Sequence, residues 1–560
     1  MKKFLSFLMV ILLSLTLASC NASSSDEQTN ITEDTLVVGM EAGYQPFNWT
    51  VYESSENTLP IYGTVGEYAD GYDVAIAKYL ANDLGRNVVI KRTVWDSLIP
   101  DLNSGEINMV LAGMTATEER KKEIAFTDPY LESELAFLIQ KKDIPAGNSI
   151  DNPMKYADLL ELFRGKALIC QANVVGDGFI DTYFSNDENK EYGIKHLDPA
   201  KTYPFAAQDV ANGQAFAMPA ELPVIQAMSN IDSAKLGVLY VNKYDFLSDD
   251  DLNGLTVSIG VKKDNVELLN ALNESLNRLS NEQRSDMMGS AAIRSAQNAS
   301  DVKGNSNWTL IVNNFKWIGY GILTTLILAL VGTFVGLIFG IFIAYGKNIK
   351  VKEMDNIGIT ILKYFIKGLC YVYSTVLRGT PMMVQALLFK YLCLAMGLNW
   401  ALIQIPGEAG NVLNGWLVAG IVVITLNTAA YMAEIVKSGL NGVDAGQREG
   451  ALSLGFSEFK TSVTVILPQA IRNALPTIGN ELIVNIKDSS VLNVIAVTEL
   501  YFRMNTIATQ TYAFLTCYII LACIYLVLTL LAAGGLKLIE KKLDGVKFSL
   551  NPFRKKRGSF

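Results

Sequence analysis

The sequence is poor in the side chains that most often build metal sites, disulfides and catalytic dyads. It contains one histidine, His196, and six cysteines in 560 residues. Apart from Cys20, the soluble first half of the chain holds a single cysteine, Cys170, which excludes a structural disulfide there. No spacing of histidine, cysteine and carboxylate residues is typical of a metal site. We expect Cys170 to be a core residue of a strand at 167–170, and His196, which has no nearby base or nucleophile, to lie on the surface.

The sequence also lacks the motif Gly-x-x-x-x-Gly-Lys-[Ser/Thr] of P-loop ATPases. Its formal net charge is −8 and its soluble part carries no basic stripe, which argues against nucleic acid as a partner. The one basic cluster lies at the C-terminal end, in the tail 541–560, and follows an apolar segment, so it indicates membrane topology. We therefore predict that the chain is not an enzyme and has no catalytic residues, metal or cofactor of its own.

Long apolar runs are absent from residues 30–305 but frequent in 308–540, although 50% of the whole chain is hydrophobic. A chain of 560 residues is long enough for more than one domain. The uneven distribution predicts a soluble part followed by a membrane part.

The N-terminus has the composition of a secretory signal. Two lysines precede the apolar stretch 4–17, and Leu17-Ala-Ser-Cys20 follows it. The last four residues resemble a bacterial lipobox, which implies a lipoprotein-type signal peptide at 1–19 and lipidation of Cys20. The alternative is a plain signal peptide with an incidental cysteine. Residues 20–34, rich in Ser, Asn, Thr and acids, are predicted to be a flexible tether.

From Thr35 onward, strand and helix patterns alternate. Strands are predicted at 36–39, 87–92 and 107–112, and helices at 73–84 and 98–104. This rhythm favours an α/β domain with parallel sheets. Ligands of such sheets bind at the carboxyl ends of the strands.

One strand end carries the chemistry expected of a ligand site. The strand at 107–112 ends in Gly113, and Thr115 and Thr117 lead into a helix that contains Arg120. Glycine permits close backbone approach, threonine offers a hydroxyl, and arginine offers a two-pronged contact for a carboxylate. A solvated helix charge is the alternative for Arg120.

Together with three further motifs, this run resembles the solute-binding proteins of polar amino acid ABC importers over about residues 35–298. The motifs are Gly43-Tyr44-Gln-Pro46-Phe47, Gly71-Tyr-Asp73-Val-Ala and Trp95-Asp-Ser-Leu-Ile-Pro100. The resemblance implies a bilobed, periplasmic-binding-protein-like fold of type II. Lobe one would be 35–140 plus 257–298 and lobe two 141–256, with hinge segments near 137–141 and 256–259. An insertion at 52–68 is expected to be a loop extension.

The resemblance also implies a pocket for a free amino acid, formed by Glu41, Tyr44, Trp95, Gly113, Thr115, Arg120 and Glu221. Arg120, Thr115 and the backbone around Gly113 would bind the α-carboxylate. Tyr44 and Trp95 would pack around the ligand side chain; core packing is the alternative for both.

Two acids complete the expected pocket. Glu41 would read the far end of the ligand side chain, and Glu221 would hold the α-ammonium, where the family usually has Asp. The loop 171–175 also departs from the family, because it lacks the common Gly-Thr or Gly-Ser pattern.

A polar loop between two apolar segments carries a second resemblance. Glu449-Gly-Ala-Leu-Ser-Leu-Gly455 is followed by nine residues and then Val465-Ile-Leu-Pro468. This is similar to the EAA loop with which ABC-importer permeases contact their ATPase. It implies a coupling loop at 444–468 whose residues are Glu449, Gly450, Ala451, Gly455 and Pro468.

Apolar runs of bilayer-spanning length occur at 318–345, 413–436, 470–497 and 514–538. A longer region, 357–398, is interrupted by Arg378-Gly-Thr-Pro381. The signal peptide places the binding domain outside and the coupling loop has to lie inside, so 357–398 must cross once. Lysines and Arg378 flank its first half, whereas 391–436 has none, so we place the crossing near 381–398, where Lys390 falls. About five crossings result.

The membrane part at 308–540 resembles the histidine/glutamine-type permeases through Val376–Gln385 and Asn480–Ser490. Four polar residues in or beside a crossing are candidates for the transport pathway or a dimer interface: Asn480, Glu481, Asn485 and Lys487. Hydrogen bonding between helices is an equal alternative.

These patterns predict the substrate-binding and permease subunit of an ATP-driven amino acid importer, with an all-α type I permease domain of about five helices. The expected partners are an ABC ATP-binding subunit dimer that uses ATP, a second permease chain (another copy or a homologue), the amino acid ligand and the lipid bilayer. The expected location is a bacterial plasma membrane, with the binding domain extracellular or periplasmic and the coupling loop and C-terminus cytoplasmic.

A ligand-gated ion channel and an amino acid sensor are the alternatives. A channel of this fold inserts its pore between the lobes, whereas both lobes here end before Trp308. A sensor needs a cytoplasmic signalling domain, which the short basic tail cannot provide.

Overall fold

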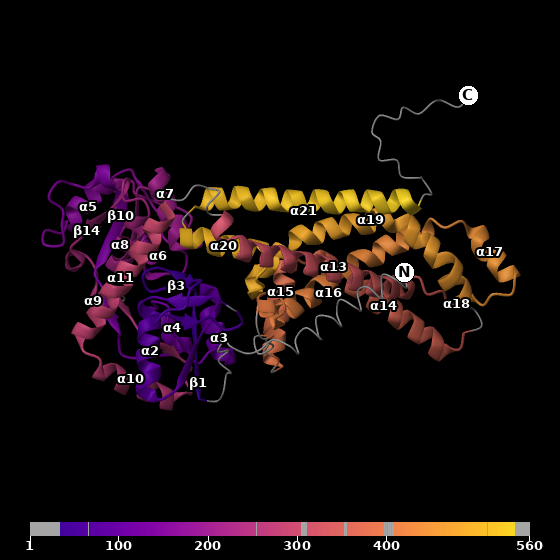
Figure 1. Cartoon of the computed structure of the whole chain (residues 1–560), viewed down its shortest axis with the longest axis horizontal. Helices are drawn as coiled ribbons and strands as arrows, with labels where there is room; N and C mark the ends of the chain where they lie inside the picture. Colours follow the sequence, from indigo (N-terminus) through magenta and orange to yellow (C-terminus); the bar gives the residue numbers. More distant parts are fainter. Residues whose placement is uncertain are drawn as a thin grey trace, which may run out of the picture. The chain divides into compact units, whose positions relative to one another are not determined.

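The computed structural model describes residues 34–543 except 65, 254, 304–310, 352–354, 397, 399, 401–404, 406–407 and 512. The predicted signal peptide, Cys20, most of the tether and the tail beyond residue 543 lie outside the described residues. The chain forms two compact units, one with the residues up to Phe315 and one with most of the remainder. Figure 1 shows the α/β elements of the first and the long helices of the second.

Lobe one of the first unit is built on a five-stranded sheet in the order β6-β1-β7-β16-β8. β1 (Thr35–Met40) is buried along its whole length and pairs in parallel with β6 (Asn87–Arg92) and β7 (Met109–Val110). Its two neighbours are reached through helices α2 and α3, as the predicted alternation requires. The remaining elements are α2 (Tyr72–Leu84), α3 (Leu98–Ser104), β8 (Ala125–Phe126), β16 (Gly260–Val261), α10 (Val266–Arg278) and α11 (Asn281–Lys303).

Lobe two is built on a second five-stranded sheet in the order β12-β11-β13-β10-β14. Its core contains Phe137, Phe163 and Phe184, whose rings meet edge to face with centroids 5.2–5.6 Å apart. The elements are β10 (Leu135–Gln140), α5 (Tyr156–Phe163), β11 (Ala167–Leu168), α6 (Val175–Phe179), β12 (Lys195–His196), α7 (Tyr203–Asn212), β13 (Ala217–Glu221), α8 (Leu222–Ile231) and β14 (Leu236–Tyr240).

The expected boundary between the lobes requires a correction. β10 (Leu135–Gln140) pairs with β13 and β14 in the second sheet, so lobe two begins before residue 140. A hinge at 137–141 is wrong, because a buried central strand cannot bend without losing its ladder. The chain passes between the lobes at β9 (Leu131–Glu132) and β15 (Thr256–Val257), which pair with each other.

The insertion at 52–68 belongs to a small sheet rather than a free loop. Its strand β4 (Leu59–Pro60) joins β2 (Gly43–Tyr44), β3 (Asn48–Val51) and β5 (Tyr68–Asp70) in the order β2-β3-β5-β4. An ion pair of 2.8 Å between Glu67 and Arg92 ties this sheet to β6. The insertion therefore extends the small sheet of lobe one whose strand β2 carries Tyr44.

Cys170 is buried, which confirms its predicted place in the core. The prediction for His196 is wrong, since only 14% of its side chain is exposed and its ring lies between two aspartates. Its Nε2 and Nδ1 atoms lie 2.9 Å from carboxylate oxygens of Asp177 and Asp181. These aspartates are four residues apart on a helical segment, so they lie on one face of it. Both are 15 or more residues from His196 in the sequence, so the sequence around His196 does not indicate the contact.

In the second unit, α13 (Phe315–Lys347) packs closely against α16 (Gly415–Asn441). Gly332, Gly336 and Gly340 recur every fourth residue along one face of α13. A Cβ atom on these glycines would lie 2.4–2.9 Å from side-chain atoms of α16, namely those of Ile424, Thr428 and Met432. Glycine spacing of this kind lets membrane helices approach to backbone contact.

The helices confirm part of the predicted membrane layout. Three of those described, α13, α16 and α21 (Phe514–Leu543), are long and apolar enough to span a bilayer. The region 357–398 breaks at Thr380–Pro381 as expected, into α14 (Ile357–Gly379) and α15 (Met382–Ala395). Lys390 of α15 is buried, and its ammonium lies 5.8 Å from the Trp416 ring centre.

The run 470–497 is not one continuous helix. α19 (Leu467–Asp488) carries several polar residues and gives way to a 3-10 segment, Ser489–Ile495. Ala496 then adopts a left-handed backbone with φ 64°. The α-helix therefore ends at Asp488, nine residues before the end of the predicted apolar run.

Candidate ligand-binding site

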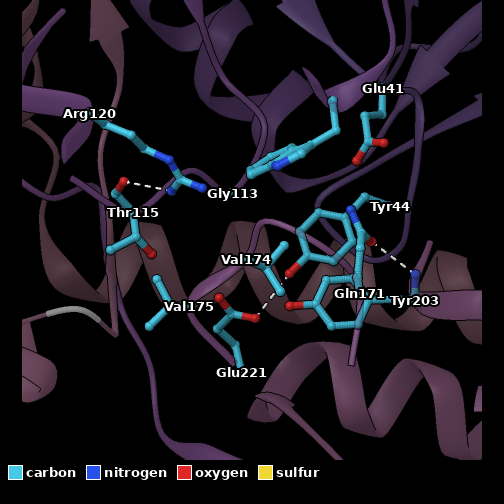
Figure 2. Close-up of a pocket in the computed structure, with 11 residues that line it drawn as sticks. Glu41, Tyr44, Gly113, Thr115, Arg120, Gln171, Val174, Val175, Tyr203 and Glu221 are labelled. Atoms are coloured by element: carbon cyan, nitrogen blue, oxygen red, sulfur yellow. Dashed lines mark hydrogen bonds between the residues drawn. The ribbon is translucent and has the colours of Figure 1, made fainter. Parts of the chain in front are cut away.

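A small cavity, with a volume of about 20 Å³, lies between the two lobes of the first unit. The structure brings all the residues expected at the pocket around it, together with others that the sequence did not indicate. The lining residues are Glu41, Tyr44, Trp95, Gly113, Thr115, Arg120, Gln171, Val174, Val175, Tyr203 and Glu221. Figure 2 shows their side chains converging from both lobes.

The loop after β7 positions Arg120. Gly113 has φ +60°, and a Cβ there would lie 2.7 Å from the Tyr44 ring, so glycine is required by both backbone and space. Thr117 caps helix α4 (Glu118–Glu123) by accepting a hydrogen bond from the Arg120 amide. This cap fixes the first turn of the helix, and thereby the place from which Arg120 reaches the cavity.

The guanidinium of Arg120 is held by two backbone carbonyls. Its Nη1 donates to the Thr115 carbonyl and its Nη2 to the Asn173 carbonyl, each at 2.9 Å. Its carbon lies 5.2 Å from the centre of the Trp95 ring. Burial lowers the pKa of Arg120, but a guanidinium stays charged at neutral pH. Since arginine has five N–H donors, the two bonds leave donors for an anion in the cavity.

Aromatic rings form one wall of the cavity. The Tyr44 ring stacks on Phe47 and on Tyr203, with centroids 5.1 and 5.2 Å apart. The Tyr44 hydroxyl donates to Glu221 Oε2 at 2.9 Å, and the Tyr203 amide donates to Gln171 Oε1 at 2.9 Å. Tyr44 is on lobe one and Tyr203 on lobe two, so this stack joins the two lobes.

Two partly buried carboxyl groups, those of Glu41 and Glu221, face the cavity. Burial, and to a smaller extent the charge of Asp96, raises the pKa of Glu41 to about 7. A hydrogen bond from the Trp95 backbone partly opposes this rise. Burial also raises the pKa of Glu221, which the hydrogen bond from Tyr44 and the charge of Arg120 partly oppose. In Figure 2, Glu41 and Arg120 approach the cavity from opposite sides. The cavity thus has a cationic side, an acidic side and a further acid near its aromatic wall.

Sequence reasoning missed Tyr203 and did not rely on the loop that contains Gln171, Val174 and Val175. That loop follows β11, so the rule that ligands bind at the carboxyl ends of parallel strands could have indicated it. Tyr203 opens α7, and no pattern in the sequence distinguishes it from a buried core tyrosine.

The predicted coupling loop folds into two short helices, α17 (Ala445–Ser453) and α18 (Glu458–Thr461). Glu449 and Gly450 are exposed on α17, whereas Ala451 is buried against the rest of the loop. Gly455 ends this turn with φ +82°, and Pro468 lies in the first turn of α19.

Two large apolar side chains of this loop are exposed, Leu454 at 80% and Phe459 at 78%. No pattern in the EAA-like motif itself predicted them. Exposed apolar residues grouped in a polar loop are typical of a protein-contact surface.

The four polar candidates of α19 separate into two groups. Asn485 is buried, and its Nδ2 donates to Thr333 Oγ1 at 2.8 Å and Thr428 Oγ1 at 3.0 Å. It therefore links α19 to α13 and α16, as the helix-bonding alternative requires. Asn480 and Lys487 are exposed and Glu481 is partly buried within the described second unit.

Two protein families match the chain. Residues 36–288 match the bacterial extracellular solute-binding proteins, family 3, and residues 357–545 match the binding-protein-dependent transport system inner membrane component. The arginine transport system permease protein ArtQ of Bacillus subtilis is 32% identical over 239 residues, which cover 43% of this chain and 98% of ArtQ. A putative glutamine transport system permease protein GlnP of Rickettsia conorii is 29% identical, covering 40% of this chain and 91% of GlnP.

Among solved structures, an ancestral arginine-binding protein bound to arginine has 28% identity and a TM-score of 0.35. The match covers 46% of this chain and 99% of that protein. The family matches are consistent with the α/β bilobed unit and the helical unit described above. The chain belongs to the amino acid ABC transporters, and it joins a family 3 solute-binding domain and an inner-membrane permease domain in one polypeptide.

Proposed function

We propose that this chain is the substrate-binding and permease subunit of an ATP-driven importer for amino acids with a cationic side chain. The observation that carries the proposal is the charge pattern of the cavity, with Arg120 on one side and Glu41 on the other (Figure 2). The cavity contributes one cationic and two carboxyl side chains. A basic amino acid carries the complementary charges, one carboxylate and two cations, so every buried charge would have a partner.

The geometry supports one orientation of the ligand. The α-carboxylate would bind the free N–H donors of Arg120 beside Thr115, and the α-ammonium would bind Glu221. The side-chain cation would then reach Glu41, with its aliphatic part against the rings of Tyr44 and Trp95. Glu221 is one methylene longer than the Asp that the family usually has at this position. It would therefore reach the ligand while its carboxylate also accepts a hydrogen bond from the Tyr44 hydroxyl.

The ligand class can be tested by calorimetric titration of the full-length chain in lipid nanodiscs. We expect L-arginine and L-lysine to bind more tightly than L-glutamine, and L-glutamate to bind least. Arg120→Ala should weaken binding by several kcal/mol, because it leaves a buried carboxylate unpaired, roughly 2–5 kcal/mol for such a pair. Lys121→Ala is the matched control, since Lys121 is exposed on the same helix. Equal affinity for L-glutamate and L-arginine would contradict the cationic assignment.

ATP hydrolysis is assigned to a separate ABC subunit dimer that docks on the loop 444–468. Exposed Leu454 and Phe459 support this docking, because they offer an apolar contact surface beside the small residues of α17. Phe459→Ala should reduce ATP-dependent uptake by proteoliposomes at least tenfold and leave ligand binding unchanged. Lys460→Ala on the same short helix is the control. Normal uptake by Phe459→Ala would contradict the docking surface.

The proposed topology places the binding domain outside a bacterial plasma membrane and the coupling loop and C-terminus inside, with five crossings. α13, α16 and α21 would cross as single helices, and α15 and α19 would supply the other two. A 14-residue helix such as α15 is roughly 21 Å long, shorter than a bilayer core of about 30 Å, so the end of α14 would complete that crossing. A second permease chain, another copy or a homologue, would complete the transport pathway. Asn480, Glu481 and Lys487 are candidates for residues that line it.

A further inference from the structure

Asn173 departs from ordinary backbone geometry at the edge of the ligand cavity. It lies in lobe two between β11 and α6, next to the cavity residues Val174 and Val175. Its φ of +62° is in the left-handed region, which asparagine tolerates better than most residues other than glycine. The left-handed turn directs its carbonyl and its side chain towards lobe one.

Three residues of lobe one bind Asn173. Its carbonyl accepts hydrogen bonds from Arg120 Nη2 at 2.9 Å and from Trp95 Nε1 at 3.3 Å. Its side-chain Nδ2 donates to Asp96 Oδ1 at 3.0 Å. One residue of lobe two thus contacts the two lobe-one side chains that flank the cavity and an acid beside them.

The contact lies on the solvent side of the cavity. Asn173 and Asp96 are exposed, whereas Glu221 and Tyr44 lie in the interior between the lobes. Arg120 donates hydrogen bonds to one backbone carbonyl of each lobe, that of Thr115 in lobe one and that of Asn173 in lobe two. The guanidinium is therefore fully oriented only while the lobes are closed.

We propose that Asn173 is the positioning residue of lobe two that holds the closed cleft and sets the rate at which the amino acid leaves. The inference rests on the proposed function, because it concerns how that site releases its ligand. The left-handed backbone of Asn173 presents its carbonyl to Arg120 and Trp95. Its side-chain amide donates a hydrogen bond to Asp96 at the entrance of the cavity. Opening the cleft breaks all three bonds before the ligand can depart.

Two substitutions separate these contributions. Asn173→Gly keeps the left-handed backbone and the carbonyl but removes the bond to Asp96. Asn173→Val strains the backbone and displaces the carbonyl as well. Since a net hydrogen bond contributes modestly, we expect dissociation of L-arginine to accelerate roughly two- to tenfold in the glycine variant and more in the valine variant. Association should be unchanged, because the open cleft does not contain these bonds.

A double-mutant cycle tests the pair directly. Asp96→Ala should accelerate dissociation as Asn173→Gly does, and the double variant should be no faster than the faster single variant. Asp96→Asn is the conservative rescue, because an amide oxygen still accepts from Asn173. Stopped-flow displacement of labelled L-arginine from the full-length chain in nanodiscs measures these rates. Additive effects, or unchanged dissociation in both Asn173 variants, would overturn the proposal.

A ligand-independent measurement keeps this test separate from the proposed function. Spin labels at Asn82→Cys on α2 and Ala157→Cys on α5, in a background without native thiols, report the distance between the lobes. Asn173→Val should broaden the distribution towards longer distances even if L-arginine is not the ligand. If wild type binds no basic amino acid but the distances shift, the ligand proposal fails and the positioning role stands. An unchanged distribution refutes the positioning role.

Discussion

Glu41 offers a substitution whose effects on ligand affinity and on stability have opposite signs. Its side chain is partly buried at the cavity, and burial raises the pKa of its carboxyl to about 7. A cationic ligand side chain would favour the charged carboxylate, whereas the empty pocket disfavours it. Affinity for L-arginine should therefore fall as the pH falls through 7, because binding then requires removal of a proton.

The magnitude follows from the position of this pKa. With a pKa of about 7, roughly nine tenths of the carboxyl groups are charged at pH 8 and one tenth at pH 6. The apparent affinity for L-arginine should be about tenfold lower at pH 6 than at pH 8, while L-glutamine should show no such loss. Glu41→Gln should remove this pH dependence and cost about 1.5–3 kcal/mol of arginine binding at pH 8.

Stability should move the other way. The folded-state pKa of Glu41 lies above its ordinary value of 4.5, so the folded state loses stability as the pH rises from about 4.5 to 7. Above pH 7 this loss is complete and amounts to about 3 kcal/mol, at 1.36 kcal/mol per pKa unit. Glu41→Gln should thus raise the melting temperature of the ligand-free protein by several degrees at pH 8 and leave it nearly unchanged at pH 4.5.

Calorimetric titration at pH 6, 7 and 8, with thermal unfolding at pH 4.5 and 8, checks both signs in one preparation. Equal arginine affinity at pH 6 and pH 8 in the wild type would refute the role of Glu41 as the partner of a cationic side chain. A lower melting temperature for Glu41→Gln at pH 8 would show that the carboxylate is paired within the protein instead.

Two further predictions concern the permease unit. Gly336→Leu should destabilise the helical unit by about 1–3 kcal/mol or more, measured as a lower thermal unfolding temperature in detergent, because its Cβ would lie 2.9 Å from Thr428 Cγ2. Gly319→Leu on the same helix has open space and should be neutral, and equal effects of the two would contradict the close approach of α13 and α16. A single cysteine at Ser457→Cys should be shielded from an impermeant thiol reagent added to intact cells, whereas one at Glu408→Cys should react. Labelling at position 457 from outside would overturn both the topology and the docking of an ATPase there.

The sequence was sufficient where a function depends on a short, continuous run of residues. The strand end at Gly113, the threonines after it and Arg120 lie within eight positions, so strand periodicity and capping rules place them together. The helices of lobe one, 72–84 and 98–104, were predicted to within a residue, because their apolar spacing is regular and glycines end them at Gly85 and Gly105.

Prediction failed where distant segments decide the outcome. Tyr203 lines the cavity, and Asn173 lies at its edge, only because lobe two folds over lobe one. Neither has a local pattern that differs from an ordinary core or loop residue. His196 meets Asp177 and Asp181 through the pairing of β12 beside a helical segment, which its sequence neighbours do not encode. The boundary at 140 was misplaced because an apolar run such as Leu135–Gln140 is equally suited to a hinge-proximal or a central strand until its partners are known.

Helix α19 shows why hydropathy alone does not define the ends of a membrane segment. The apolar run 470–497 extends beyond the helix, which ends at Asp488, and it includes Asn485, whose amide is buried in hydrogen bonds to Thr333 and Thr428. Some polar residues of α19 are tolerated because neighbouring helices form hydrogen bonds with them. The composition of the segment does not reveal these partners. Of the candidates proposed for the pathway, Asn485 is therefore explained by packing. The exposed Asn480 and Lys487 and the partly buried Glu481 remain candidates for the transport pathway or for a dimer interface.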